Sequence, residues 1–307
     1  MNNLIPIVRK IARRFNWAGF FIEKGKYPLP WVIVAGYTRS GTTFLGRILA
    51  NCLGCRPIHE PLNPRNAHET SFFNERESLT AIKENQRYQK ALMKIFGPDF
   101  KGSKYTNTGT RLVYDGRLVK IVRGNHYLDY LFELLPGQKF VFIMRNPCAC
   151  ISSRLRLGWP VPNHSHMIKD IAPSLSTAQL ELYEKTGTMI DKLAVSWCLD
   201  NFMALKNMSN SAFLFMHYEN LVLDPVSELQ RVFSHIGRQV SKEKILHELG
   251  WENMNYDATM YLSSWKKHMD MEDQRRVWEI AGIFGLSTLY NHESGLPDAD
   301  NFRADGN

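Results

Sequence analysis

Apolar residues along this chain follow two patterns, short β-branched or aromatic runs and longer stretches with helical spacing. A continuous apolar run of strand length is typical of a strand buried on both faces of a parallel sheet. Such runs predict strands at 31–35, 118–122, 139–144 and 213–216. Helical spacing predicts helices that begin near 41 and 147, with others at 78–96, 126–135, 189–207, 225–236 and 271–282. Because the two patterns alternate, the sequence predicts an α/β, three-layer, P-loop-like fold with a central, mainly parallel sheet flanked by helices.

The regions between these elements suggest how the 307 residues are divided. We expect one domain over 30–290, since a chain of this length can bury a full core. The patterning is irregular near 63–117 and 158–190, which we interpret as insertions, the second of them a lid or acceptor-side segment. Residues 291–307 are polar and are expected to form a frayed tail.

Residues 1–29 form a basic segment with a single acidic residue, Glu23. Its apolar residues fall on one helical stripe, made of Leu4, Val8, Ile11 and Phe15. Two interpretations stay open for this amphipathic segment. It is either an interfacial helix that lies on anionic lipid or a helix that docks on its own domain.

Charge and cysteine usage narrow the class of protein. The net charge of +8 favours anionic partners such as a nucleotide, an acidic glycan or a membrane surface, and charge alone does not choose among them. No apolar run reaches the length of a membrane-spanning helix. Five cysteines without a signal peptide predict reduced thiols in a cytoplasmic protein, with membrane contact only through residues 1–26. No cysteine or histidine pair has zinc spacing beside Cys52-x-x-Cys55, so we expect no metal.

The strand at 31–35 leads into a glycine-flanked loop. Gly36 and Gly41 have the spacing of the front half of a P-loop, but Thr42 stands where the lysine of a nucleotide triphosphatase is required. The loop carries its cation earlier, at Arg39, and a second hydroxyl follows at Thr43. A loop that joins a strand to a helix N-terminus directs backbone N–H groups at an anion. The loop therefore predicts a phosphate site.

Other polar residues follow the predicted strands at the same edge of the sheet. Glu60 follows a short strand within 56–62, and Arg145 ends the strand at 139–144, ahead of Asn146, a good N-cap. Lys120 lies in the strand at 118–122. Ligands of open α/β sheets bind at the carboxyl ends of the strands, so we expect these side chains to meet there.

The loop Thr38-Arg39-Ser40-Gly41-Thr42-Thr43-Phe44-Leu45 resembles the 5′-phosphosulfate loop of sulfotransferases that use 3′-phosphoadenosine 5′-phosphosulfate (PAPS). Met144-Arg145-Asn146-Pro147 through Ser152-Ser153-Arg154-Leu155 is similar to their 3′-phosphate motif, which implies that Arg145 and Ser153 hold that phosphate. The resemblance extends over about 31–290. It implies a cofactor site made of Arg39, Ser40, Gly41, Thr42, Thr43, Phe44, Arg145, Ser153, Tyr218 and Lys266.

Two of these residues come from weaker motifs. His217-Tyr218-Glu219-Asn220-Leu221 resembles the family's Tyr-Glu-Asp/Asn-Leu segment, so Tyr218 lies either near the adenine or in the core. Trp265-Lys266-Lys267 resembles the Trp-Lys of the region that closes over the nucleotide. The Arg-Lys-Gly of the cytosolic branch is absent there, and a solvated lysine is the alternative for Lys266.

The resemblance also implies the catalytic residues. Glycan and tyrosyl-protein sulfotransferases often place a catalytic glutamate shortly after the loop helix, which makes Glu60 the expected base. Arg39 would serve the leaving phosphate, and Lys120 is either a second cation for the sulfuryl group or a lysine at the sheet rim. His59 is the fallback base, but strand alternation predicts that it faces away from Glu60.

The sequence therefore predicts a sulfotransferase that moves a sulfuryl group from PAPS to an acceptor hydroxyl, releasing PAP, without a metal. The loop and the Glu60-Pro61-Leu62 segment resemble bacterial and carbohydrate enzymes more than phenol and steroid enzymes, which favours a glycan or glycolipid acceptor. A small lipid, sterol or other alcohol stays open as acceptor. The rivals are a P-loop kinase or NTPase, weakened by Thr42, and a non-catalytic basic module. No nucleic-acid partner is expected.

Overall fold

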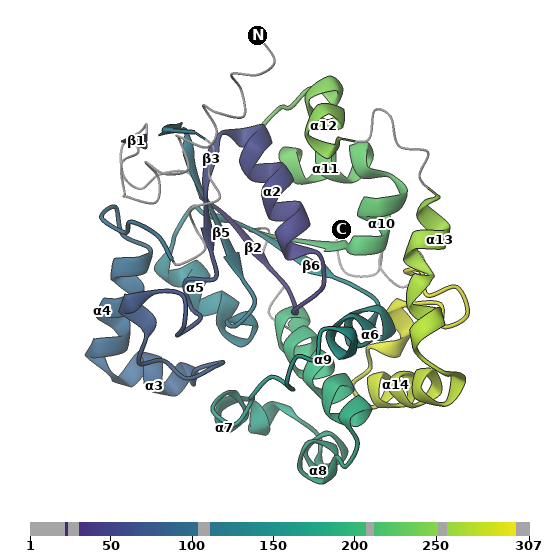
Figure 1. Ribbon diagram of the computed structural model, residues 1–307. Coiled ribbons are helices and arrows are strands. Elements are labelled where there is room, and N and C mark those ends of the chain that lie inside the picture. Colours follow the sequence, from purple (N-terminus) through teal and green to yellow (C-terminus); the bar gives the residue numbers. More distant parts are fainter. Residues whose placement is uncertain (1–21, 24–30, 104–110, 207–211, 251–256, 299–307) are drawn as a thin grey trace.

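The computed structural model describes residues 22–23, 31–103, 111–206, 212–250 and 257–298 (Figure 1). Its centre is a sheet of five strands in the order β3-β5-β2-β6-β7, and each strand runs parallel to its neighbours. The strands are β2 (Trp31–Ala35), β3 (Cys55–His59), β5 (Gly116–Ile121), β6 (Lys139–Met144) and β7 (Phe213–His217). A separate parallel pair joins β1 (Ile22–Glu23) to β4 (Val113–Tyr114). The predicted central parallel sheet is confirmed.

Helices cover both faces of the sheet, as the three-layer prediction requires (Figure 1). One face packs against α2 (Thr42–Leu53), α10 (Tyr218–Leu223), α11 (Pro225–His235) and α12 (Lys242–Leu249). The other packs against α5 (Leu128–Leu134), α6 (Pro147–Arg156), α9 (Met189–Lys206) and α14 (Met271–Ile283). Shorter helices lie further out, namely α3 (Leu79–Glu84), α4 (Gln86–Ile95), α7 (Met167–Ile171), α8 (Thr177–Lys185) and α13 (Ala258–Leu262).

The sequence of β2 explains why it lies inside the molecule. Val32 and Val34 point to the face that α2 covers, whereas Ile33 and Ala35 belong to the core cluster on the opposite face. Successive strand residues point to opposite faces, so a run of apolar residues can be buried only where both faces are covered. This burial fixes β2 between β5 and β6.

The strand order opens a crevice beside β2. The chain leaves β2 through α2 toward β3 on one side, and later passes from β5 to β6 on the other side. At such a switch point the loops at the carboxyl ends of the strands diverge, and ligands bind between them. The loop at 36–41 follows β2 and therefore lies at this point.

Several boundaries differ from the sequence prediction. The helix predicted over 78–96 is two helices, because Asn85 has an extended backbone and its side chain accepts a hydrogen bond from the Arg87 N–H of α4. The tail is not frayed over 291–298, since Asn291 N–H donates to the Leu296 carbonyl at 2.8 Å and the Asn146 side chain donates to the Gly295 carbonyl at 2.9 Å. The apolar stripe of residues 1–26 lies outside the described residues, so its membrane contact stays a prediction.

The only acidic residue of the N-terminal segment has a structural role. Glu23 on β1 accepts hydrogen bonds from two arginines, Arg56 of β3 and Arg117 of β5. The guanidinium Nη2 of Arg117 lies 2.6 Å from Glu23 Oε2. Both arginines are almost fully buried, and they also donate to backbone carbonyls in the segment 97–101. Glu23 thus fixes β1 to the main sheet.

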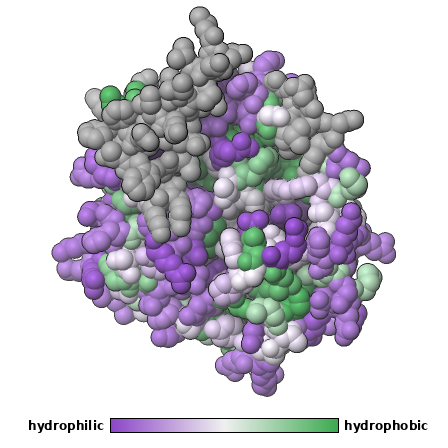
Figure 2. All heavy atoms as spheres, in the orientation of Figure 1, coloured by the Kyte–Doolittle hydropathy of each residue, from purple (hydrophilic) through white to green (hydrophobic). Residues whose placement is uncertain are grey.

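The outer surface is mostly hydrophilic on the face seen in Figure 1, as expected for side chains that meet water (Figure 2). Within the described ranges, no helix combines the length and the apolar character that crossing a bilayer requires. All five cysteines are free thiols and all are buried.

Candidate functional site

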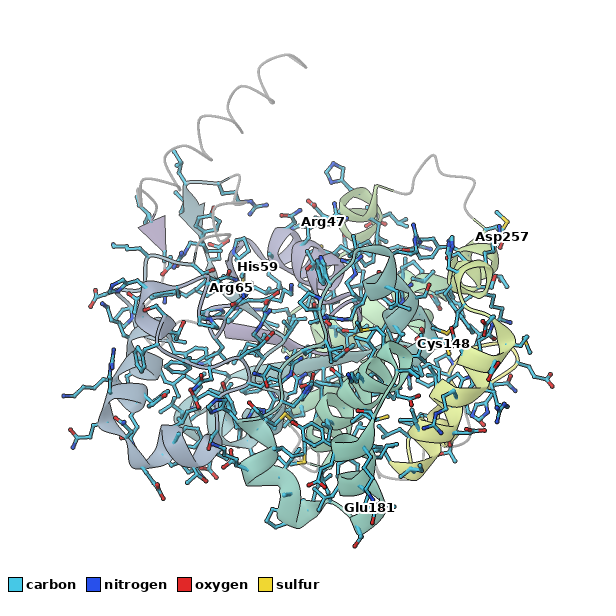
Figure 3. The ribbon with its side chains drawn as sticks, turned by 60° about the horizontal axis from the view of Figure 1, so that its bottom comes forward. Arg47, His59, Arg65, Cys148, Glu181 and Asp257 are labelled. Carbon is cyan, nitrogen blue, oxygen red and sulfur yellow. The ribbon has the colours of Figure 1, made fainter. Side chains whose placement is uncertain are left out.

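A cavity of about 1020 Å³ opens at the carboxyl edge of the sheet. Every predicted catalytic residue and most predicted cofactor residues line it, namely Arg39, Gly41, Thr42, Thr43, Phe44, Glu60, Lys120, Arg145 and Tyr218. Figure 3 labels His59 and Arg65, which also line the cavity, and Cys148, which lies outside it. The structure therefore brings these residues together at one edge of the sheet, and their roles stay predictions.

The loop after β2 is shaped by its two glycines. A Cβ atom at Gly36 would lie 2.4 Å from the Ile143 carbonyl oxygen. Gly41 has φ +97°, and a Cβ there would lie 2.3 Å from the ring of Tyr218. Both glycines are needed because the loop is pressed against β6 and Tyr218. The helix that follows, α2, begins without a side-chain cap, so its N-terminal N–H groups and dipole remain available to an anion.

Arg39 turns toward the neighbouring helix. Its backbone has φ +71°, and its Nε donates to Ser153 Oγ on α6 at 2.9 Å. Its guanidinium carbon lies 5.5 Å from the centre of the Trp159 ring. Ser153 is therefore placed beside Arg39, and it does not line the cavity. The role of Ser153 at a 3′-phosphate stays a prediction.

Arg145 reaches into the same cavity from the end of β6. Its guanidinium carbon lies 4.4 Å above the Tyr218 ring, and its Nη1 donates to the Arg39 carbonyl at 3.3 Å. Its Nε is buried and has no hydrogen-bond partner among the described residues. A buried donor without an acceptor is costly, and a bound phosphate oxygen would satisfy it. The Tyr218 hydroxyl also lies 3.1 Å from that of Tyr261, which lines the cavity.

Glu60 lies at the centre of a group of cations. Its Oε1 accepts from Lys120 Nζ at 2.8 Å, and its Oε2 accepts from Arg123 Nη1. Burial alone would raise the pKa of Glu60, but the hydrogen bond from His59 and the charges of Lys120 and Arg123 outweigh burial and hold the pKa well below its usual range. Burial lowers the pKa of Lys120, and Glu60 opposes that effect. Glu60 is therefore ionised, and Lys120 is held by its contact with Glu60.

The prediction that His59 faces away from Glu60 is wrong. His59 Nε2 lies 3.5 Å from Glu60 Oε1 and 3.4 Å from Lys120 Nζ. The strand ends at His59, and Glu60 has φ +46°, a left-handed conformation in which the alternation of strand side chains no longer applies. His59 and Glu60 therefore both line the cavity.

Besides Ser153, two predicted residues do not line the cavity. Ser40 is fully buried, and its hydroxyl donates to the Tyr37 carbonyl at 2.7 Å, which closes the turn of the loop. Lys266 is exposed and donates to the Glu293 carbonyl. Neither side chain lines the cavity, so a direct contact of Lys266 with a nucleotide stays a prediction.

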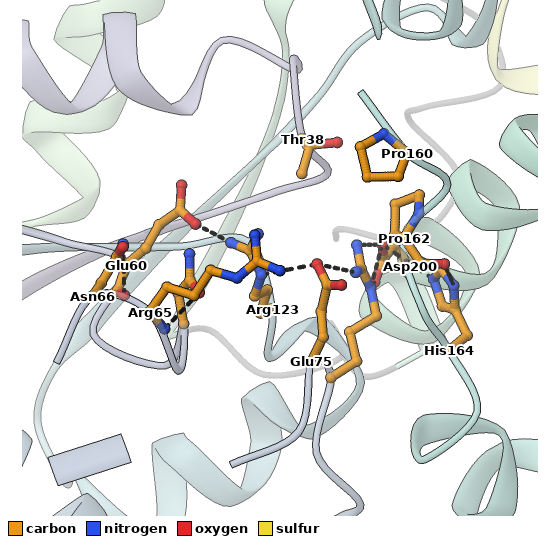
Figure 4. Close-up of polar contacts among 12 residues, drawn as sticks. Thr38, Glu60, Arg65, Asn66, Glu75, Arg123, Pro160, Pro162, His164 and Asp200 are labelled. Atoms are coloured by element: carbon orange, nitrogen blue, oxygen red, sulfur yellow. Dashed lines mark hydrogen bonds and ion pairs between the residues drawn. The ribbon is translucent and has the colours of Figure 1, made fainter. Parts of the chain in front are cut away.

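Sequence reasoning missed a chain of charges that continues from Glu60 (Figure 4). Arg123 also donates to Glu75 Oε1 at 3.1 Å, and Glu75 lies 3.6 Å from Arg76 Nη1. Arg76 in turn forms a fully buried ion pair with Asp200 of α9, at 2.6 Å. The position of Arg123 was a usable signal, because it directly follows the strand predicted at 118–122, which contains Lys120.

A second buried carboxylate supports Arg145. Glu219 Oε1 accepts from the Asn146 N–H at 2.9 Å, and the Tyr290 hydroxyl donates to Glu219 Oε2 at 3.5 Å. Burial raises the pKa of Glu219 to about 7, against the lowering effects of the Asn146 N–H and of Arg145. Glu219 thus fixes the turn that carries Arg145, and it titrates near neutral pH.

This raised pKa predicts a pH-dependent effect of Glu219→Gln on stability. As pH rises from the ordinary pKa of 4.5 to about 7, the unfolded chain releases a proton that the folded protein keeps, so stability falls with pH. Glutamine cannot ionise and avoids this loss, which for such a shift is about 3 kcal/mol. Urea unfolding at about pH 5 and about pH 8 should show that the stability of the variant relative to the unchanged protein increases at the higher pH. An equal difference at both pH values would contradict the raised pKa.

Comparisons with known proteins identify the family of the chain. A family profile described as the Sulfotransferase family matches residues 30–242, and no curated protein matches. A sulfotransferase domain from the curacin biosynthetic pathway is 17% identical, with 82% of this chain and 98% of that chain covered and a TM-score of 0.45. The corresponding domain of the Synechococcus PCC 7002 olefin synthase is 18% identical, with 85% and 96% covered and a TM-score of 0.46.

The profile match spans most of the chain, from the start of β2 to the start of α12. It includes the loop at 36–41, Glu60, Lys120 and Arg145. The family predicted from the sequence is confirmed, and the chain belongs to the sulfotransferase family.

Proposed function

We propose that this protein transfers a sulfuryl group from PAPS to a hydroxyl of a glycan or glycolipid. The observation that carries the proposal is the meeting of three groups at one cavity: the uncapped N-terminus of α2, the guanidinium of Arg145 with its unsatisfied Nε, and the carboxylate of Glu60 between cations. A donor with a phosphate at each end of its ribose and an acceptor hydroxyl would use all three.

The charge of the cavity supports such a donor. Among the described residues, its lining holds six cationic side chains and two carboxylates. A phosphate monoester carries close to two negative charges, and a phosphosulfate adds one on each of its two groups, so PAPS brings about four. A donor of this charge balances the excess of cations in the cavity.

Each residue has a distinct task in the proposed reaction. PAPS supplies an activated sulfuryl group, whose bond to the 5′-phosphate oxygen breaks as a bond to the acceptor oxygen forms. Glu60 takes the proton of the acceptor hydroxyl. Arg39 and the α2 N-terminus hold the charge left on the phosphate. Lys120 forms an ion pair with Glu60 and would also stabilise the negative charge of the sulfuryl oxygens. When Lys120 interacts with those oxygens, its ion pair with Glu60 weakens, which raises the pKa of Glu60 and makes this carboxylate a better base.

The kinase alternative is less favoured. Thr42 stands at the position where a triphosphatase needs a lysine for the β- and γ-phosphates. Arg145, at the end of the neighbouring strand β6, fits a second phosphate on the same nucleotide better than a linear triphosphate chain. The loop therefore favours a nucleotide with phosphates at two separate positions.

The direct test is the affinity for PAP compared with that for AMP, which lacks the 3′-phosphate, and for ATP with Mg²⁺. We expect PAP to bind most tightly by calorimetry. Arg145→Ala should lower the affinity for PAP by about 10- to 100-fold, the value of charge-assisted hydrogen bonds of about 1.5–3 kcal/mol. The affinity for AMP should change much less, because Arg145 is assigned to the 3′-phosphate.

Arg156→Ala is the matched control, since Arg156 is an exposed arginine of α6 that does not line the cavity. This variant should bind PAP as the unchanged protein does. Tighter binding of ATP with Mg²⁺ than of PAP would overturn the proposed donor.

A further inference from the structure

We infer that Trp159 is the platform on which a neutral sugar ring of the acceptor stacks, and that Asp200 is the positioning residue that holds this platform opposite Glu60. This inference rests on the proposed function and names the acceptor end of the same cavity. It is carried by the exposure of Trp159, by the contacts that fix it in place, and by the distribution of charge along the cavity.

Trp159 is an exposed aromatic residue of the cavity. Its side chain is 44% exposed, and it lines the cavity beside the loop that follows β2. The guanidinium carbons of Arg39 and Arg154 lie 5.5 and 5.7 Å from its ring centre. A large aromatic side chain that is left open inside a polar cavity offers area for a ligand to cover.

The segment around Trp159 is fixed before any ligand binds. The N–H of Trp159 donates to the Arg154 carbonyl at 3.3 Å, and the Arg154 side chain donates to the Pro160 carbonyl. Pro160 and Pro162 have fixed φ angles, and His164 Nδ1 lies 3.0 Å from the Pro162 carbonyl oxygen. A platform that is already ordered loses little conformational entropy on binding.

Asp200 contacts two residues from different segments beside the cavity, Arg76 and His164 (Figure 4). It is fully buried on α9, and both its oxygens accept from Arg76 Nε at 3.0 Å. Its Oδ2 also lies 3.5 Å from His164 Nε2. Arg76 contacts Glu75 on one side of the cavity, and His164 contacts the Pro162 carbonyl in the segment that contains Trp159. Arg76 has φ +53°, a strained conformation that is kept only where the surroundings enforce it.

The charge distribution points to a neutral acceptor. In the part of the chain that the structure describes, the cavity lining holds six cations and two carboxylates, and two of the cations, Arg39 and Arg154, lie beside the Trp159 ring itself. PAPS carries about four negative charges and offsets this excess once it is bound. The cavity that holds the donor then has no excess of positive charge, so it offers nothing to attract an anionic acceptor.

Polar groups of the cavity lining favour a sugar over an apolar ring. Asn63, Asn66 and Asn74 line the cavity together with Arg65 and Glu75, and each of the three amides makes a hydrogen bond within the protein and keeps further donor or acceptor capacity. An apolar acceptor would cover these groups without offering hydrogen bonds, which is costly. A pyranose has an apolar face for the Trp159 ring and hydroxyls at its edge for the amides. It therefore satisfies both kinds of surface.

The test measures sulfuryl transfer from labelled PAPS to maltose, trehalose and chitobiose, to a disaccharide that contains glucuronate, and to 2-naphthol. We expect transfer to a neutral sugar. Trp159→Ala should raise the KM for that sugar by about tenfold or more, the usual loss at a buried aromatic contact, with a much smaller change in the Kd for PAP. Trp159→Phe should restore most of the affinity. Leu157→Ala, which removes a neighbouring side chain that is 47% exposed and outside the cavity, should change neither value.

Asp200 is tested through His164, because loss of the buried carboxylate itself endangers folding. His164→Gln should raise the KM for the sugar without changing the Kd for PAP. Combined with Trp159→Ala it should add little, since both changes then act on the same contact. Fully additive effects on KM would overturn the positioning role of Asp200 and His164.

The outcomes separate this inference from the proposed function. If PAP does not bind, the proposed function fails and this inference with it. If PAP binds and only 2-naphthol or the glucuronate sugar is sulfated, the acceptor class is overturned while the donor stands. If a neutral sugar is sulfated equally well by Trp159→Ala, the platform is overturned.

Discussion

Replacing Glu60 with glutamine is expected to reduce sulfuryl transfer by about 10²- to 10⁴-fold, the usual contribution of a general base. The amide has nearly the same shape and still accepts a hydrogen bond from Lys120, but it cannot take a proton from the acceptor. Glu60 is assigned to the acceptor rather than to the nucleotide, so the Kd for PAP should stay close to that of the unchanged protein. Initial rates with labelled PAPS and calorimetry with PAP measure the two effects separately.

Glu75→Gln provides the control for Glu60→Gln, because Glu75 also accepts a hydrogen bond from Arg123 and lines the same cavity. Glu75 is not assigned the role of base, so Glu75→Gln should lower the rate of transfer far less than Glu60→Gln. If the two variants lost the same activity, the effect would belong to the charge of the cavity and not to a base at Glu60.

The pH dependence of activity tests Glu60 as the base. Because its partners hold the pKa of Glu60 well below the usual range, Glu60 stays ionised and able to act as a base in weak acid. Activity that depends on Glu60 should therefore persist as the pH falls to about 5. A loss of activity above that pH that Glu219→Gln does not remove would contradict Glu60 as the base.

The sheet and the donor side of the site could be predicted from local patterns. The strands are continuous apolar runs, and parallel strands bring their carboxyl ends to one edge, so Glu60, Lys120 and Arg145 were placed together without knowledge of the fold. The position of His59 could not be predicted in this way. It depends on the positive φ of Glu60, which no alternation rule contains.

The acceptor side depends on contacts between distant segments. Arg76 and Asp200 are separated by 124 residues in the chain, and their ion pair leaves no periodic signal in either segment. The region 63–78 is polar and irregular in sequence, yet Arg76 and Glu77 within it are almost fully buried. A charged residue is buried only where its partner is supplied, and only the fold shows which partner that is.

Glu23→Ala is expected to lower the free energy of unfolding by about 3–5 kcal/mol, because it removes a carboxylate that accepts hydrogen bonds from two buried arginines. Arg56 and Arg117 are 2% and 0% exposed, and both donate to Glu23. The backbone carbonyls that accept other N–H groups of the two arginines remain in the variant, but they carry no net charge. Urea unfolding followed by circular dichroism gives the loss, and Glu272→Ala, at an exposed glutamate of α14, should change stability by no more than about 0.5 kcal/mol.

The contact of Glu23 with the two arginines also allows a test of the two interpretations of the N-terminal segment. Removal of residues 1–21 keeps Glu23 and should leave stability nearly unchanged, whereas removal of residues 1–29 should be as destabilising as Glu23→Ala. If both truncations were harmless, the two arginines would not need Glu23, and β1 would contribute nothing to the fold. If removal of residues 1–21 leaves stability unchanged but abolishes binding to vesicles that contain anionic lipid, the amphipathic segment makes the membrane contact, and Glu23 joins that segment to the domain.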